Sequence, residues 1–222
     1  MHLTSSFKKI IKRLTPNFFL KAMMKFEYPV LKILYKYFSR PVTQLETAKA
    51  KTRRFNEKFF SKYCNGSGLD IGYGGDILIN GCRGFDFEHG DAQYLKGLKA
   101  ESFDYVYSGH TLEHMTDESL ALKNWWRVVK PGGYLILYIP HRDLYEKRKS
   151  LPSQWNPDHK HLFLLDKDEE PDTVGVVPLI AKSLIGYEIE YAKVCDEGYV
   201  SHGPNSHSDG EYSIEVVLKK MG

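Results

Sequence analysis

The feature that most constrains the fold is the texture of the chain from Gly68 onward, where short apolar runs alternate with helical stretches. Such alternation is typical of a doubly wound α/β domain, in which helices cover both faces of a mostly parallel sheet. The runs that predict successive parallel strands are residues 69–71, 84–87, 103–108 and 134–139. Residues 187–194 and 212–218 alternate apolar with polar side chains instead, so we expect the sheet to end in an antiparallel pair.

The region before this domain has a different composition. Its first 60 residues carry 14 Lys and Arg against three Glu, while the rest of the chain has 17 basic and 25 acidic residues and a net charge of −8. Stretches of amphipathic helical pattern alternate there with Pro16, Pro29 and Pro41. The sequence therefore predicts a basic α-helical arm over residues 1–63 and an acidic α/β domain over residues 64–222. The acidic domain argues against a nucleic-acid partner.

The basic arm has two interpretations that the sequence leaves open. It is either a helical surface that contacts anionic lipid, or a set of helices that packs on the α/β domain or on a second copy of the chain as a homo-oligomer. No apolar run reaches the roughly 20 residues of a membrane span. The widely separated Cys64, Cys82 and Cys195 are typical of a reducing compartment. We therefore expect a cytoplasmic protein, with peripheral contact at the inner membrane surface under the first interpretation.

A glycine-rich turn follows the first predicted strand, with the sequence Asp70-Ile71-Gly72-Tyr73-Gly74-Gly75. Glycines let the backbone bend tightly and approach a nucleoside ligand closely. A dinucleotide site would have a third glycine at position 77, where this chain has isoleucine, so a ligand without a pyrophosphate is favoured. Asp70 is suited to an ammonium group of that ligand.

Two further acidic positions follow the second predicted strand. Asp86 is placed to accept hydrogen bonds from both hydroxyls of a ribose. The pair Asp91-Ala92 resembles the acidic and small residues that bind an adenine amino group, although Asp91 also fits an ordinary surface loop. Only a very short connection separates the two positions, so we expect almost no helix between them.

Four motifs in order resemble those of class I methyltransferases. They are Gly68-Leu69-Asp70-Ile71-Gly72-Tyr73-Gly74, Phe103-Asp104-Tyr105-Val106-Tyr107-Ser108, Leu112-Glu113-His114 and Val129-Lys130-Pro131-Gly132-Gly133-Tyr134. The chain is most similar to small bacterial enzymes of the methyltransferase-11 type, often associated with surface-glycan assembly. It departs from that pattern at Asp76, where a third glycine is usual.

The resemblance implies a Rossmann-like fold and S-adenosylmethionine as the cofactor. It implies cofactor contacts from Asp70, Gly72, Gly74, Asp86, Asp91, Ala92 and Ser108. The cofactor carries an activated methyl group, so the protein has mainly to align an acceptor and remove a proton.

Histidines are the natural bases for a hydroxyl acceptor, because their ordinary pKa lies near working pH. His110 and His141 each follow a predicted strand, at the sheet edge where ligands bind. His159 lies in a polar loop that could close over the acceptor. His159 and His161 with Asp158 are an alternative metal-binding set, but further ligands at suitable spacing are not evident, so no metal is predicted.

The expected reaction is O-methylation of a sugar hydroxyl in glycan biosynthesis, that is, of a small-molecule or saccharide acceptor. The alternatives are N-methylation of a small amine or amino sugar, and a catalytically silent domain that binds S-adenosylmethionine and assembles with another enzyme.

Overall fold

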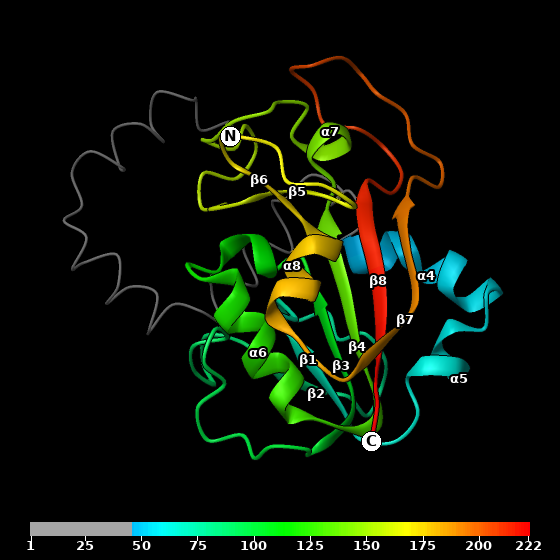
Figure 1. The fold of residues 1–222 in the computed structure, drawn as a ribbon. Helices are drawn as coiled ribbons and strands as arrows, with labels where there is room; N and C mark the ends of the chain where they lie inside the picture. The colour runs from blue at the N-terminus through cyan, green and yellow to red at the C-terminus, as the bar shows by residue number, and fades with distance from the viewer. Residues whose placement is uncertain (1–45) are drawn as a thin grey trace, which may run out of the picture. The chain divides into compact units, whose positions relative to one another are not determined.

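A six-stranded mixed sheet forms the centre of the molecule. The computed structural model describes residues 46–222. The strands lie in the order β2-β1-β3-β4-β8-β7, and β1 to β4 are parallel while β8 runs antiparallel to both β4 and β7 (Figure 1). Their bounds are Gly68–Ile71 (β1), Arg83–Phe85 (β2), Phe103–Gly109 (β3), Val129–Pro140 (β4), Tyr187–Cys195 (β7) and Ser213–Lys220 (β8). The Rossmann-like fold with a terminal antiparallel pair is confirmed.

Each face of the sheet has its own apolar core, because successive strand residues point to opposite faces. On one face Leu135 and Leu137 pack with α6 (Glu118–Val128) and α8 (Val176–Ser183). On the other face Ile136 and Tyr138 pack with α4 (Glu46–Asn56) and α5 (Phe59–Tyr63). This double burial explains why β4 is almost continuously apolar in the sequence.

Helix α6 begins directly after a capping residue. Asp117 is its N-cap, and its Oδ1 accepts a hydrogen bond of 2.8 Å from Leu120 N. The connections beside the sheet are shorter than in a regular α/β domain: residues 72–82, between β1 and β2, and residues 86–102, between β2 and β3, contain turns and no helix. The expected near-absence of a helix after β2 is thus confirmed.

Helix α4 is fastened to the sheet by a buried ionic network. The fully buried Arg54 donates from Nε to Glu215 Oε2 (2.7 Å), and its guanidinium lies 4.5 Å from the centre of the Tyr138 ring. The neighbouring Arg53 binds Glu211 (2.9 Å) and Glu215 (3.0 Å). Because of these contacts, α4 and α5 belong to the same compact unit as the sheet. The boundary expected between residues 63 and 64 falls directly after α5 and stays a prediction.

The α-helical arm expected over residues 1–63 contains a break near its end. Lys58 adopts a left-handed conformation with φ 56°, so α4 and α5 are separate helices. The expectations for the basic arm before residue 46, including its contact with lipid or a second copy, lie outside the described residues. Among the helices that the structure does describe, none has the length and apolarity to cross a membrane.

A layer of irregular structure covers the end of the sheet to which β3 and β4 point (Figure 1). It contains the 3-10 helix η1 (Leu112–His114), helix α7 (Arg142–Tyr145) and a two-stranded parallel sheet of β5 (Leu162–Leu164) and β6 (Thr173–Gly175). This layer brings the loops that follow β3 and β4 together, and the candidate site lies beneath it.

Candidate functional site

The glycine turn after β1 is packed directly against the segment that follows β3. Gly72, Gly74 and Gly75 have φ values of 72°, 56° and 85°. A Cβ atom on Gly72 would lie 2.0 Å from Thr111 Oγ1, and this hydroxyl donates to Ile71 O at 3.1 Å. A Cβ on Gly74 would meet nothing nearer than Gly72 O at 4.0 Å. Gly72 therefore joins the turn to the β3 loop, whereas Gly74 borders open space.

Asp86 lies where the sequence placed it, at the end of β2 beside the glycine turn. The parallel register sets Ile71 opposite Phe85. Gly74 N donates to Asp86 Oδ2 (2.9 Å), and Phe87 N donates to Asp86 Oδ1 (2.8 Å). The carboxylate is half-buried, so it is held at the turn with room to contact a ligand.

Phe87, which no sequence motif indicated, directly follows Asp86 and lies next to its carboxylate. Its side chain is 95% exposed, the highest value among the large apolar side chains of the described residues, ahead of Ile185 at 87%. An aromatic face in open solvent beside a hydroxyl-binding carboxylate is suited to cover a planar base. The local signal was an aromatic residue directly after the acidic end of a strand.

Asp70 has an inward orientation. Its side chain is buried, and its Oδ2 accepts a hydrogen bond of 2.7 Å from Leu78 N, so it closes the far end of the glycine loop. Burial raises the pKa of Asp70 to about 7, despite the opposing hydrogen bond from Leu78 N. The carboxylate is thus a support for the loop, with a protonation state that is sensitive to a nearby cation.

Ser108 lies at the end of β3, opposite Ile71 in the parallel register. Its hydroxyl is buried and has no hydrogen-bond partner among the residues that the structure describes. A buried hydroxyl without a partner is costly, and a ligand group would satisfy it. The candidate cofactor residues Gly72, Gly74, Asp86 and Ser108 therefore gather at one edge of the sheet.

Asp91 and Ala92 lie in the turn region after β2. Asp91 Oδ1 accepts from Gln93 N (2.8 Å), and Ala92 O accepts from the Trp125 indole (2.8 Å). Helix α6 thus fixes the position of this pair through Trp125. Asp91 itself is exposed.

Two of the three candidate bases come together around a buried carboxylate. Glu113 Oε1 lies 3.7 Å from His110 Nδ1 and 3.9 Å from His159 Nε2. His159 Nδ1 lies 2.7 Å from Glu146 Oε1, at the end of α7. Burial, with smaller contributions from the charges of His159 and Lys49, lowers the pKa of His110 to about 3. His110 is therefore neutral near pH 7, and the same shift makes it a weak proton acceptor.

The third candidate base lies apart from this cluster. His141 is the N-cap of α7, and its Nδ1 accepts a hydrogen bond of 3.2 Å from Asp143 N. Burial lowers its pKa. The local geometry gives His141 a capping role, although it does follow β4 as the sequence predicted.

The His-x-His set considered for a metal is divided by the structure. His161 Nε2 lies 3.0 Å from Met115 O and 3.2 Å from Glu118, away from His159. Glu113 and Glu146 were not selected from the sequence. Glu113 was visible in the Leu-Glu-His motif, but nothing local indicated that His159, 46 positions later, would face it.

Aromatic rings surround the histidine cluster. Tyr145 stacks on His159, with ring centres 5.7 Å apart, and also contacts His110 and Tyr212. A few polar groups set among aromatic side chains are typical of a small-molecule site.

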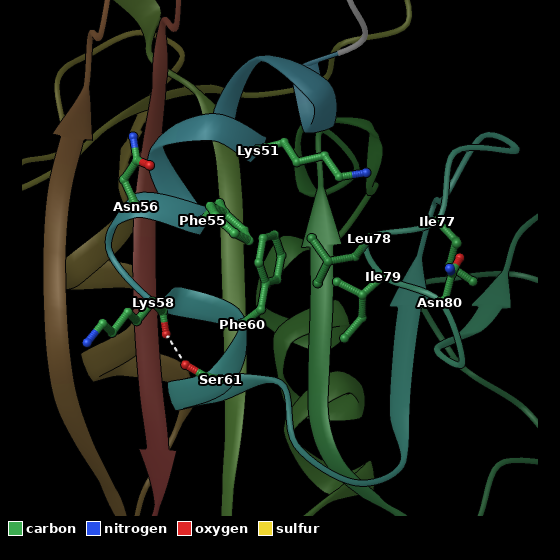
Figure 2. A pocket seen from close by; sticks show the side chains of 10 residues that line it. All are labelled: Lys51, Phe55, Asn56, Lys58, Phe60, Ser61, Ile77, Leu78, Ile79 and Asn80. Carbon is green, nitrogen blue, oxygen red and sulfur yellow. Dashed lines mark hydrogen bonds between the residues drawn. The ribbon is translucent and has the colours of Figure 1, made fainter.

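A separate hollow of about 750 Å³ lies between α4, α5 and the loop of residues 77–80. Figure 2 shows Phe55 and Phe60 facing Leu78 and Ile79 across it. Among the residues that the structure describes, no acidic side chain or histidine lines it. This mainly apolar hollow lacks carboxylates of the kind that Asp86 offers beside the glycine turn, so we do not place the cofactor there.

Comparison with known proteins supports a methyltransferase domain. Residues 40–137 match the family model described as a methyltransferase domain, Methyltransf_11. The chain is 39% identical over 82 residues to the ubiquinone/menaquinone biosynthesis C-methyltransferase UbiE of Cellvibrio japonicus. This matched segment covers 36% of this chain and 29% of that protein. It is 39% identical over 54 residues to the trans-aconitate 2-methyltransferase of Deinococcus radiodurans, and this match covers 24% of this chain and 19% of that protein. The chain thus spans less than a third of either relative.

Solved structures share the fold. One, from work on the conversion of a disulfide bond into a thioacetal group during echinomycin biosynthesis, has a TM-score of 0.53 at 14% identity and covers 87% of this chain and 92% of that one. The [4+2]-cyclase SpnF has a TM-score of 0.51 at 13% identity, with 90% and 94% covered. Identities this low establish the fold alone. The matched family model, described as a methyltransferase domain, covers less than half of the chain.

Proposed function

We propose that this chain, whose residues 40–137 match the methyltransferase domain family, transfers the methyl group of S-adenosylmethionine to a hydroxyl of a small saccharide. The observation that carries the proposal is that the glycine turn and the histidine cluster lie side by side at one edge of the sheet. Thr111 packs on Gly72 of the glycine turn, and its neighbours His110 and Glu113 belong to the histidine cluster. A cofactor held at the turn therefore places its reactive end close to a group that can accept a proton.

The residues at the turn fit the cofactor. Asp86 offers carboxylate oxygens for the ribose hydroxyls, exposed Phe87 offers a face for adenine, and the buried Ser108 hydroxyl lacks a partner among the described residues. The open space beside Gly74 admits the ligand without moving the backbone. When bound, the cofactor supplies a methyl group on a sulfonium, which a nucleophile can take up without metal or redox chemistry.

The histidine cluster supports a hydroxyl acceptor. A hydroxyl needs to lose its proton as the methyl group arrives, and His110 and His159 are the bases nearest to the turn. The carboxylate of Glu146 orients His159 through Nδ1. Tyr145 and Tyr212 add aromatic faces of the kind on which sugar rings pack. The resemblance to glycan-assembly enzymes supports the saccharide class.

The test uses the full chain and two measurements. Calorimetry should show S-adenosylmethionine binding, and the Asp86→Asn variant should weaken it about 10- to 100-fold, because it loses charge-assisted hydrogen bonds worth about 1.5–3 kcal/mol. Release of S-adenosylhomocysteine should appear with nucleotide sugars or glycans. His202→Ala is the control, since His202 is exposed and paired with Asp209.

The fold is shared with a cyclase, so binding by itself does not establish methyl transfer. Turnover with phosphoamines but not with sugars would replace the hydroxyl acceptor by an amine. Tight cofactor binding with no turnover on any acceptor would refute the proposal in favour of a silent binding domain.

A further inference from the structure

Three side chains at the histidine cluster point one donor atom each toward a common space. They are Glu113 and His114, both in η1, and His159 in the loop that follows α7. Their donor atoms all lie within 4.8 Å of one another. Glu113 Oε1 is 3.9 Å from His114 Nε2 and 3.9 Å from His159 Nε2. These separations are too long for hydrogen bonds. They are less than about 1 Å longer than the spacing of two donors on one ion with bonds of about 2.0–2.2 Å.

Glu113 lacks the partners that a buried carboxylate needs. Its side chain is fully buried, and neither of its oxygens has a hydrogen-bond donor among the residues that the structure describes. Isolated buried carboxylates are costly, and proteins pair them with cations or use them as metal ligands. The histidine nitrogens that face Glu113 stand too far away to satisfy it directly. A cation in the space between them would.

Both histidines are held from behind by a carboxylate. His159 Nδ1 contacts Glu146 Oε1 (2.7 Å), and His114 Nδ1 contacts Asp158 Oδ2 (3.2 Å). A carboxylate at Nδ1 keeps the proton there, so Nε2 presents its lone pair. In both rings that is the nitrogen nearest to Glu113. Metal-bound histidines show this arrangement, in which an outer carboxylate fixes the tautomer and the ring orientation.

The outer carboxylate of His159 is itself firmly positioned. Glu146 is buried and accepts from Ser153 Oγ (2.7 Å) and Gln154 N (3.0 Å). A single histidine acting as a base would need only Glu146. It would require neither a second oriented histidine nor a buried Glu113 without a donor. These contacts together thus fit a bound ion better than they fit a single histidine base held by a carboxylate.

We propose that Glu113, His114 and His159 bind one divalent transition-metal ion, with Zn²⁺ favoured by two imidazoles and one carboxylate. His110, whose Nδ1 lies 3.7 Å from Glu113 Oε1, borders the remaining open position. The inference rests on the proposed function and deepens it, since it assigns His159 to the ion and leaves His110 as a neutral imidazole beside the acceptor. An acceptor hydroxyl bound to the ion would lose its proton more easily. Metal binding itself does not depend on methyl transfer.

The decisive experiment measures metal binding without cofactor or acceptor. The full, tag-free chain is stripped with a chelator, dialysed against ZnCl₂ and analysed for metal by mass spectrometry, and Zn²⁺ affinity is measured by competition with a chromophoric chelator. One equivalent is expected. Co²⁺ in the same site should give visible d–d absorption bands that Mg²⁺ does not suppress.

Variants identify the ligands. Glu113→Gln, which keeps the side-chain shape, and His159→Ala should each lower Zn²⁺ affinity at least tenfold, and Glu146→Gln should lower it about 10- to 100-fold by releasing the His159 ring. His161→Ala is the matched control, because His161 lies in the same loop but contacts Met115 O and Glu118. Its affinity should be unchanged.

Two outcomes would overturn the site: no stoichiometric Zn²⁺ in the wild-type chain, or unchanged affinity in both Glu113→Gln and His159→Ala. Thermal unfolding of each metal-free variant separates loss of ligands from loss of fold, and Glu113→Gln should unfold no earlier than the wild type. Calorimetry with S-adenosylmethionine keeps the two proposals distinct. Retained cofactor binding without metal binding refutes the ion alone, whereas metal binding without cofactor binding refutes the proposed function alone.

Discussion

Replacing Glu215 by Gln should strongly destabilise the protein, because it removes the charge that two arginines share. Arg54 and Glu215 are both fully buried and approach to 2.6 Å, and Arg53 reaches the same carboxylate at 3.0 Å. Glutamine keeps the volume but leaves the Arg54 guanidinium buried without a counter-charge. Breaking a buried pair in this way costs about 3–5 kcal/mol. For a chain of this size that is a fall in Tm of roughly 6–20 °C.

Arg53 supplies an internal control for this prediction. It also pairs with Glu57 at 3.0 Å, but the Glu57 side chain is 41% exposed. Glu57→Gln should therefore cost about 0.5 kcal/mol or less. Urea unfolding followed by circular dichroism gives both values. A loss below about 1 kcal/mol for Glu215→Gln, or equal losses for the two variants, would refute the conclusion that this network fastens α4 to the sheet.

Three further predictions concern the pH dependence of stability, the glycine turn and the exposed ring of Phe87. Burial alone would raise the pKa of Glu215, but Arg54 and Arg53 lower it to about 2; its stabilising contribution is therefore complete above pH 4.5 and lost as the pH falls toward 2, and urea titrations over this window should show a smaller loss in Glu215→Gln. Gly72→Ala should cost about 1–2 kcal/mol for its left-handed backbone and about 1–3 kcal/mol more for its clash with Thr111, whereas Gly74→Ala should cost only the first amount; equal unfolding free energies would contradict the packing described. Phe87→Ala should change stability by less than about 0.5 kcal/mol yet weaken S-adenosylmethionine binding about three- to tenfold in calorimetry; an unchanged Kd would remove Phe87 from the site.

The parts of the fold that the sequence predicted have local signals. The alternation of apolar runs and the glycine turn each depend on a few neighbouring residues. Parallel pairing then brings the ends of β1, β2 and β3 to one edge, so the proximity of Asp86 to Gly74 could be anticipated. The near-absence of a helix after β2 was equally predictable, because Asp86 and Asp91 lie too close together for one.

The parts that it did not predict depend on contacts between distant positions. Glu113 meets His159 across 46 residues, and Arg54 meets Glu215 across 161. Nothing near Arg54 distinguishes it from the neighbouring basic residues of the arm, so its burial could not be anticipated. The inward orientation of Asp70 likewise depends on Leu78 N, whose position is fixed only when the loop closes.

The position of β8 has a consequence for how the chain assembles. Residues 213–220 insert between β4 and β7, although both of those strands precede them in the sequence. Until β8 pairs, β4 presents an unsatisfied row of backbone donors and acceptors flanked by Leu135, Leu137 and Ile139, which is the kind of edge that recruits strands from other molecules. Closure over some 80 residues is intrinsically slow. Fragments that stop before residue 213 should therefore accumulate as aggregates, while the intact chain conceals this edge in the middle of its sheet.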